Sequence, residues 1–100
     1  MEIIKTKENN ILCVKLVGRL DTNTSTELEE AIKADQNDVS EINLDLKDLD
    51  YISSAGLRLL LVMHKNMSAK KGKLTVLNPK DDVMEVFDMT GFSSFLNIED

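Results

Sequence analysis

The sequence predicts one α/β domain spanning residues 1–100, with a mixed β-sheet and helices packed mainly on one face of that sheet. Three observations lead to this fold class. The chain has 100 residues, 42% of them hydrophobic, which is enough for one core but not for two. Its first two apolar runs are separated only by a short polar turn, which predicts an antiparallel hairpin. The later strand-like runs alternate with helix-like runs, which predicts parallel strands joined by right-handed crossovers.

The opening hairpin is predicted from two apolar segments. Ile3 and Ile4 belong to a short first strand, and the run 11–17 forms a strongly apolar second strand. Asn9 and Asn10 lie between them, and asparagine is common in tight turns. Strands joined this closely pair antiparallel, so the sheet is expected to begin with an antiparallel pair.

The first helix is predicted from a capping pattern and an apolar stripe. Thr24 and Glu27 have the three-residue spacing of a capping box, in which two side chains satisfy the free N–H groups at a helix start. Leu28, Ala31 and Ile32 then follow at helical spacing. We therefore expect a helix that buries one face against the sheet.

The middle of the chain is the most apolar part. Ile42, Leu44 and Leu46 alternate with polar residues, which predicts a strand buried mainly on one face. The run 57–63 is apolar almost all round, which is typical of a largely buried helix. Gly72 fits the carboxyl-terminal cap of that helix.

The last quarter of the chain predicts one more strand and one more helix. Residues 74–77 form a short apolar strand. A third helix can start at Asp81 or Asp82 and can end at Gly91. Residues 95–98 fit either a last edge strand or a docked tail, and the sequence leaves both open.

Composition limits the function. The net charge of −6 argues against a nucleic-acid or anionic-membrane partner, since both need a basic face. The amino terminus lacks the pattern of a signal peptide, and no stretch approaches the roughly 20 apolar residues of a membrane helix. We therefore expect a cytoplasmic protein. Cys13 is the only cysteine, and its place in an apolar strand predicts a small core residue.

The most informative segment joins the apolar strand to the apolar helix and contains Ser53, Ser54 and Gly56. Backbone N–H groups at a helix start are unpaired and carry the positive end of the helix dipole. A serine there can cap the helix, or it can carry a phosphate that those N–H groups hold. Gly56 permits close backbone approach, and Arg58 lies one helical turn after Ser54. The residues alone leave the cap and the phosphate both open.

Three segments resemble the STAS domain family, which includes the bacterial anti-sigma-factor antagonists. Residues 52–57, Ile-Ser-Ser-Ala-Gly-Leu, are similar to the family's signature and follow a strand that ends in Leu-Asp. Residues 18–21 with Thr24 resemble the loop after the family's second strand, and residues 86–92 resemble its last helix and the turn beyond. The resemblance covers nearly the whole chain and implies a STAS-type sheet.

The resemblance also implies a binding protein controlled by phosphorylation. In the family, the unmodified form binds an anti-sigma factor that is also a serine kinase, and this frees the sigma factor. The kinase phosphorylates the serine at this helix start, the complex dissociates, and a metal-dependent serine phosphatase restores the binding form. Carried over by position, the phosphate acceptor is Ser54, with Ser53 as the alternative, and Asp21 lies in the neighbouring loop.

The partner-binding residues implied by the resemblance come from two loops and the helix start: Asp21, Thr24, Ser53, Ser54, Ala55, Gly56 and Arg58. The chain departs from the family pattern around the acceptor. Many antagonists have aspartate where Ser53 stands, serine or threonine where Ala55 stands, and a small residue where Arg58 stands. These departures leave open the choice between the two serines and the class of kinase.

Two other functions stay open. A structural STAS subunit of a larger signalling or transport assembly would use Ser54 only as a cap and would never be phosphorylated. A receiver-like domain would be phosphorylated on an aspartate beside magnesium, with Asp45, Asp48 and Asp50 as the candidate carboxylates. The alternative interpretation of these three aspartates is a solvated strand end.

The sequence does not indicate catalysis or a cofactor. His64 is the only histidine, so no convincing nucleophile–His–acid set and no transition-metal site can be assembled. No glycine-rich phosphate loop occurs. We expect a non-enzymatic protein without catalytic residues, metal or cofactor, in which His64 is a partly buried packing residue with one hydrogen bond.

Overall fold

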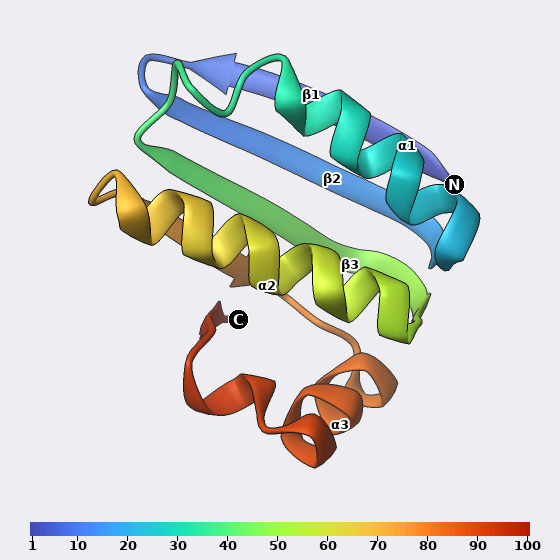
Figure 1. The fold of residues 1–100 in the computed structure, drawn as a ribbon. Coiled ribbons are helices and arrows are strands. Elements are labelled where there is room, and N and C mark those ends of the chain that lie inside the picture. The colour runs from blue at the N-terminus through green and yellow to red at the C-terminus, as the bar shows by residue number, and fades with distance from the viewer.

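The computed structural model describes all residues, 1–100. Its elements follow in the order β1 (Glu2–Glu8), β2 (Ile11–Leu20), α1 (Thr22–Lys33), β3 (Glu41–Ile52), α2 (Ser54–Ala69), β4 (Lys73–Leu77), α3 (Asp81–Thr90), the short 3₁₀ helix η1 (Phe92–Ser94) and β5 (Asn97–Glu99). Figure 1 shows these elements arranged as one sheet with helices packed against it.

The sheet has five strands in the spatial order β1-β2-β3-β4-β5. The β1–β2 pair is antiparallel and turns at Asn9, whose φ of 58° is the left-handed conformation that the turn requires. Every other neighbouring pair is parallel. The predicted mixed sheet, with an opening hairpin followed by parallel strands, is therefore confirmed.

Helices α1 and α2 contact each other and lie side by side over one face of the sheet (Figure 1). The alternation predicted for β3 is confirmed, since Ile42, Leu44 and Leu46 are buried. Strand β2 alternates as well, with Leu12 and Leu16 fully buried. Cys13 is exposed, so the prediction of a core cysteine is wrong. It lies between Leu12 and Val14, both fully buried, and alternation turns its side chain to the opposite face of the sheet.

Helix α1 begins three residues earlier than the sequence predicted. Its N-cap is Asp21, and the capping box joins Asp21 to Thr24 rather than Thr24 to Glu27. Glu27 is exposed on the outer side of the helix. Asp21 is favoured over Thr24 as the N-cap because its carboxylate both accepts a backbone hydrogen bond and complements the helix dipole.

The end of α2 also differs in detail from the expectation. Lys71, with φ of 61°, adopts the left-handed conformation, and the Gly72 N–H donates to the carbonyl of Met67 at 2.7 Å. This is a Schellman motif in which Lys71, one residue before the expected Gly72, takes the left-handed position. A Cβ at Gly72 would lie 2.6 Å from the carbonyl oxygen of Ser40, so this position needs glycine for close packing and not for its φ.

Helix α3 starts at Asp81, and Gly91, with φ of 81°, caps its carboxyl end, as the sequence predicted. It packs on β3, and Val83 and Phe87 of α3 are buried in the single core. The open question about the tail is settled, since Asn97–Glu99 forms edge strand β5, parallel to β4. None of the helices combines the length and apolar character that a membrane crossing needs.

Candidate functional site

The candidate site lies where β2 and β3 end and α1 and α2 begin. The two loops are tied together, because the Ser53 N–H donates a hydrogen bond to the carbonyl of Leu20 at 2.8 Å. Leu20 and Ile52 also face each other in the parallel register of β2 and β3. The sheet therefore brings two helix starts to the same edge, and both helix dipoles direct their positive ends toward it.

The two adjacent serines have different roles in the structure. Ser53 is the N-cap of α2, with extended backbone, and its Oγ accepts a hydrogen bond from the Gly56 N–H at 3.2 Å. Ser54 is the first residue of the helix. It is exposed, and its hydroxyl makes no hydrogen bond within the chain. Ser53 is thus the cap, and Ser54 presents a free hydroxyl.

This division predicts unequal effects of two alanine substitutions. Ser53→Ala should lower the free energy of unfolding by about 1 kcal/mol, because it removes the cap. Ser54→Ala should leave that free energy nearly unchanged, because no hydrogen bond is lost. Urea denaturation of both variants beside the unmodified protein measures the difference. Equal losses at the two positions would contradict the assignment of Ser53 as the cap.

Gly56 brings the start of α2 against the end of β2. It is buried, and a Cβ placed there would lie 2.9 Å from Cγ1 of Ile52 and 3.0 Å from Cδ2 of Leu20. Both distances are shorter than ordinary carbon contacts. The glycine therefore sets how closely the serine-bearing turn sits on the β2–β3 edge.

Asp21 and Thr24 form the neighbouring helix start and engage each other. The Thr24 N–H donates to Asp21 Oδ1 at 3.0 Å, and the Asp21 N–H donates to Thr24 Oγ1 at 2.7 Å. Thr24 Oγ1 in turn donates to the carbonyl of Arg19 at 2.7 Å. The hydrogen bond from the Thr24 backbone N–H is the main reason that the pKa of Asp21 is lowered from its ordinary value.

The lowered pKa predicts how acid affects stability. The ionised Asp21 stabilises the fold above its unfolded pKa of about 3.9, and this contribution is lost as the pH falls through the lower folded pKa. Asn caps helices about as well as Asp but carries no charge. The stability advantage of the unmodified protein over Asp21→Asn should therefore shrink as the pH falls below about 5 and through the lowered folded pKa. Urea midpoints across this range measure it, and a constant advantage would contradict the prediction.

Two arginines lie close to the site in sequence. Arg19 places its guanidinium 4.1 Å from the centre of the Tyr51 ring, which holds it by a cation–π contact. Arg58 is exposed on α2, one turn after Ser54, and forms no ion pair within the chain. Arg58 is therefore the free cation of this region.

The aspartates considered for a receiver-like site do not gather. Asp48 pairs with Lys15 at 3.1 Å, Asp50 pairs with Lys80, and the Asp45 carboxylate accepts from the Lys47 N–H. No group of three or more metal-binding side chains occurs in the structure. All three lie within β3 and none beyond it, so the expected strand end is wrong, and they are polar residues along that strand.

His64 lies on α2 and packs against Phe95, with the ring centres 5.1 Å apart. It is half-buried, as expected, but it makes no hydrogen bond within the chain. The predicted single hydrogen bond is therefore wrong. The ring is held by its aromatic neighbour instead.

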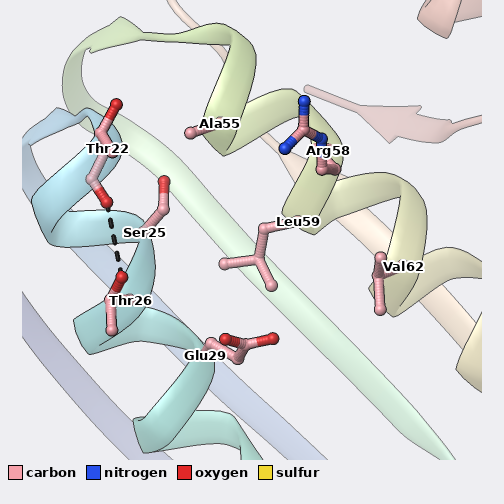
Figure 2. Close-up of a pocket in the computed structure, with 8 residues that line it drawn as sticks. All are labelled: Thr22, Ser25, Thr26, Glu29, Ala55, Arg58, Leu59 and Val62. Atoms are coloured by element: carbon pink, nitrogen blue, oxygen red, sulfur yellow. Dashed lines mark hydrogen bonds between the residues drawn. The ribbon is translucent and has the colours of Figure 1, made fainter.

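The sequence did not predict a groove that lies between α1 and α2. It has a volume of about 230 Å³, and its lining includes Ser25, Glu29, Ala55, Arg58 and Leu59 (Figure 2). No motif predicts it, because it arises where two helices pack. One signal was present in the sequence: Ser25 shares the inward stripe of α1 with Leu28 and Ile32, which is an unusual place for a hydroxyl.

Fold and site together define the class of this protein. It is a small α/β domain that presents a free serine hydroxyl at a helix start, beside the start of a second helix. The STAS domain model matches residues 2–100. The chain therefore belongs to the STAS domain family.

Known relatives match over almost the full chain. BtrV of Bordetella bronchiseptica, which is provisionally named an anti-sigma factor antagonist, is 36% identical over 98% of this chain and 85% of its own length. The anti-sigma F factor antagonist of Paenibacillus polymyxa is 31% identical over 100% of this chain and 87% of its own. The solved structure of unphosphorylated SpoIIAA, an anti-sigma factor antagonist, superposes with a TM-score of 0.85 at 21% identity, covering 97% of this chain and 87% of that one.

Proposed function

We propose that this protein is an anti-sigma factor antagonist. In this proposal its unmodified form binds a serine-kinase anti-sigma factor and releases the sigma factor, and phosphorylation of Ser54 ends that binding. The names of the relatives support the antagonist role. The observation that carries the switch is the exposed, unpaired hydroxyl of Ser54 at the first position of α2.

Ser54 is the better acceptor of the two serines on physical grounds. A kinase must reach the hydroxyl, and Ser54 is exposed whereas Ser53 is half-buried. The Ser53 hydroxyl is also engaged, because its oxygen accepts a hydrogen bond from the Gly56 N–H, whereas the Ser54 hydroxyl has no partner in the chain. The proposal therefore places the phosphate on Ser54.

The proposed partner surface surrounds this serine. Ser53, Ala55 and Gly56 shape the turn, Asp21 and Thr24 form the adjoining helix start, and Arg58 supplies a cation. Within the proposal, a metal-dependent serine phosphatase removes the phosphate and restores the binding form. The protein itself acts in the cytoplasm by binding and not by catalysis.

The phosphate is expected to act on the complex rather than on the fold. It adds about −1.5 to −2 charges. At a helix start such a charge is favourable by about 0.3–1 kcal/mol, so the domain should stay folded. Desolvating the same charge unpaired in an interface costs several kcal/mol, and each ~1.4 kcal/mol is about tenfold in affinity. The interface effect is the larger one.

The direct test is phosphorylation by the candidate kinase. A pull-down from the native cell, with the unmodified protein as bait, supplies the anti-sigma factor. With ATP it should add one phosphate to the protein and to Ser53→Ala, and none to Ser54→Ala, as read by intact mass and peptide mapping. A phosphate on Ser53 would contradict the assignment of Ser54 as the phosphorylation site. A protein that stays unphosphorylated, both in this assay and in its native cell, would favour a structural STAS subunit.

A further inference from the structure

The groove between α1 and α2 runs beyond the first hollow. A second hollow of about 150 Å³ shares Glu29, Leu59 and Val62 with it. The hollows therefore form one groove along the two helices, and Arg58 lines only the part nearer the helix starts. Leu59 is buried and Val62 is 41% exposed, so an apolar strip lies along α2.

Ser25 is the unusual residue in this groove. It is 7% exposed, and its Oγ is buried without any hydrogen-bond partner in the chain. Figure 2 shows this hydroxyl pointing into the space between α1 and α2, toward the side where Ala55 lies. A buried hydroxyl without a partner destabilises a fold. A hydrogen-bonding group from outside the chain would remove that cost.

The chemistry around Ser25 favours a negatively charged partner group. Arg58 lines the same hollow, has no carboxylate partner, and presents a planar set of donors suited to a carboxylate. Both helices start at this end and their dipoles favour an anion there, while the carboxylates of Asp21 at the start of α1 and Glu29 in the hollow oppose one. Leu59 supplies an apolar floor for the methylene part of a long acidic side chain.

We propose that this end of the groove receives a glutamate side chain of the partner protein. Arg58 pairs with its carboxylate, and Ser25 Oγ–H donates a hydrogen bond to it. A phosphate on Ser54 stands one turn before Arg58, within reach of its guanidinium, and so competes with the glutamate for that cation. This inference rests on the proposed function, because it names the chemistry by which the partner recognises the unmodified protein.

The groove can be tested without the partner, using N-acetyl-glutamate amide as the probe and N-acetyl-glutamine amide as its neutral match. Amide chemical shifts of α1 and α2 should move saturably with the glutamate probe and not with the glutamine probe. Arg58→Gln should abolish the effect. Glu29→Gln removes the groove's own carboxylate and should strengthen it. Equal responses to the two probes, or no change in Arg58→Gln, would overturn the proposal.

Ser25→Ala separates a binding role from a structural one. Removing an unpartnered buried hydroxyl should leave the melting temperature equal or higher, while the dissociation constant of the pulled-down kinase rises about tenfold, the size expected for one hydrogen bond to a charged group. Thr26→Ala is the control, because the Thr26 hydroxyl already donates within α1. Undiminished binding in Ser25→Ala would overturn the inference. If the unmodified protein captures no kinase at all, the proposed function fails, and the probe titration still judges the groove.

Discussion

Ser54→Asp should abolish binding of the proposed serine-kinase anti-sigma factor while leaving the domain folded. The change places one permanent negative charge at the first position of α2, where the hydroxyl is now exposed and unpaired. Aspartate is favourable there by about 0.3–1 kcal/mol, because it complements the helix dipole. The circular dichroism spectrum and melting temperature should therefore stay close to those of the unmodified protein.

The same charge should be costly in the complex. A carboxylate buried in an interface without a partner loses several kcal/mol of hydration, which is a loss of at least about 100-fold in affinity. Isothermal titration with the purified kinase measures this. Ser54→Asn is the matched control, because it has nearly the same shape without the charge and should bind. Tight binding by Ser54→Asp, or loss of binding in both variants, would contradict a charge-gated interface.

Gly56→Val should be the most destabilising single change in the site. Its side chain would enter a space where even a Cβ lies 2.9 Å from Ile52 and 3.0 Å from Leu20. Helix propensity favours Val over Gly by only a few tenths of a kcal/mol, whereas overpacking typically costs about 1–3 kcal/mol. We expect a net loss near the upper end of this range, about 2–2.5 kcal/mol, which lowers the melting temperature of a domain of this size by about 8 °C or more.

Thermal and urea unfolding of Gly56→Val measure this loss. Ala55→Val is the control, because it adds a β-branched side chain in the same helical turn at a half-exposed position. It should cost about 0.5 kcal/mol, the propensity difference between the two residues. If Gly56→Val loses no more stability than Ala55→Val, the close contact between α2 and β2 does not restrict the side chain at position 56.

The serine junction shows where sequence reasoning stopped. Spacing predicted that a helix starts beside Ser53 and Ser54, because a strand-like run meets a helix-like run there. It left the two hydroxyls equivalent. Only the backbone conformation of Ser53, extended with its Oγ turned to the Gly56 N–H, assigns the cap and frees its neighbour. A shift of one residue in where the helix starts decides which serine is the cap. Helix propensities do not locate a helix start to within one residue.

Cys13 and Ser25 show that the sequence also does not determine burial. The apolar character of its segment suggested a buried cysteine, but alternation in β2 places Cys13 on the face opposite to the helices. Ser25 follows helical spacing onto the inward stripe of α1, yet its lack of a partner depends on what α2 brings opposite it. Whether a side chain is buried depends on the segment that packs against it. The sequence of one segment does not say which other segment that is.

The sequence by itself determined the mixed α/β fold, the opening hairpin and the helix that starts at the serine pair. These features follow from the local spacing of apolar residues and from the order of the elements along the chain, and both can be seen in the sequence. The tertiary structure decided that two helix starts share one sheet edge, that Ser54 is free, and that a groove with an unpartnered hydroxyl lies beside it. Those features depend on distances between segments far apart in the chain, which only packing sets.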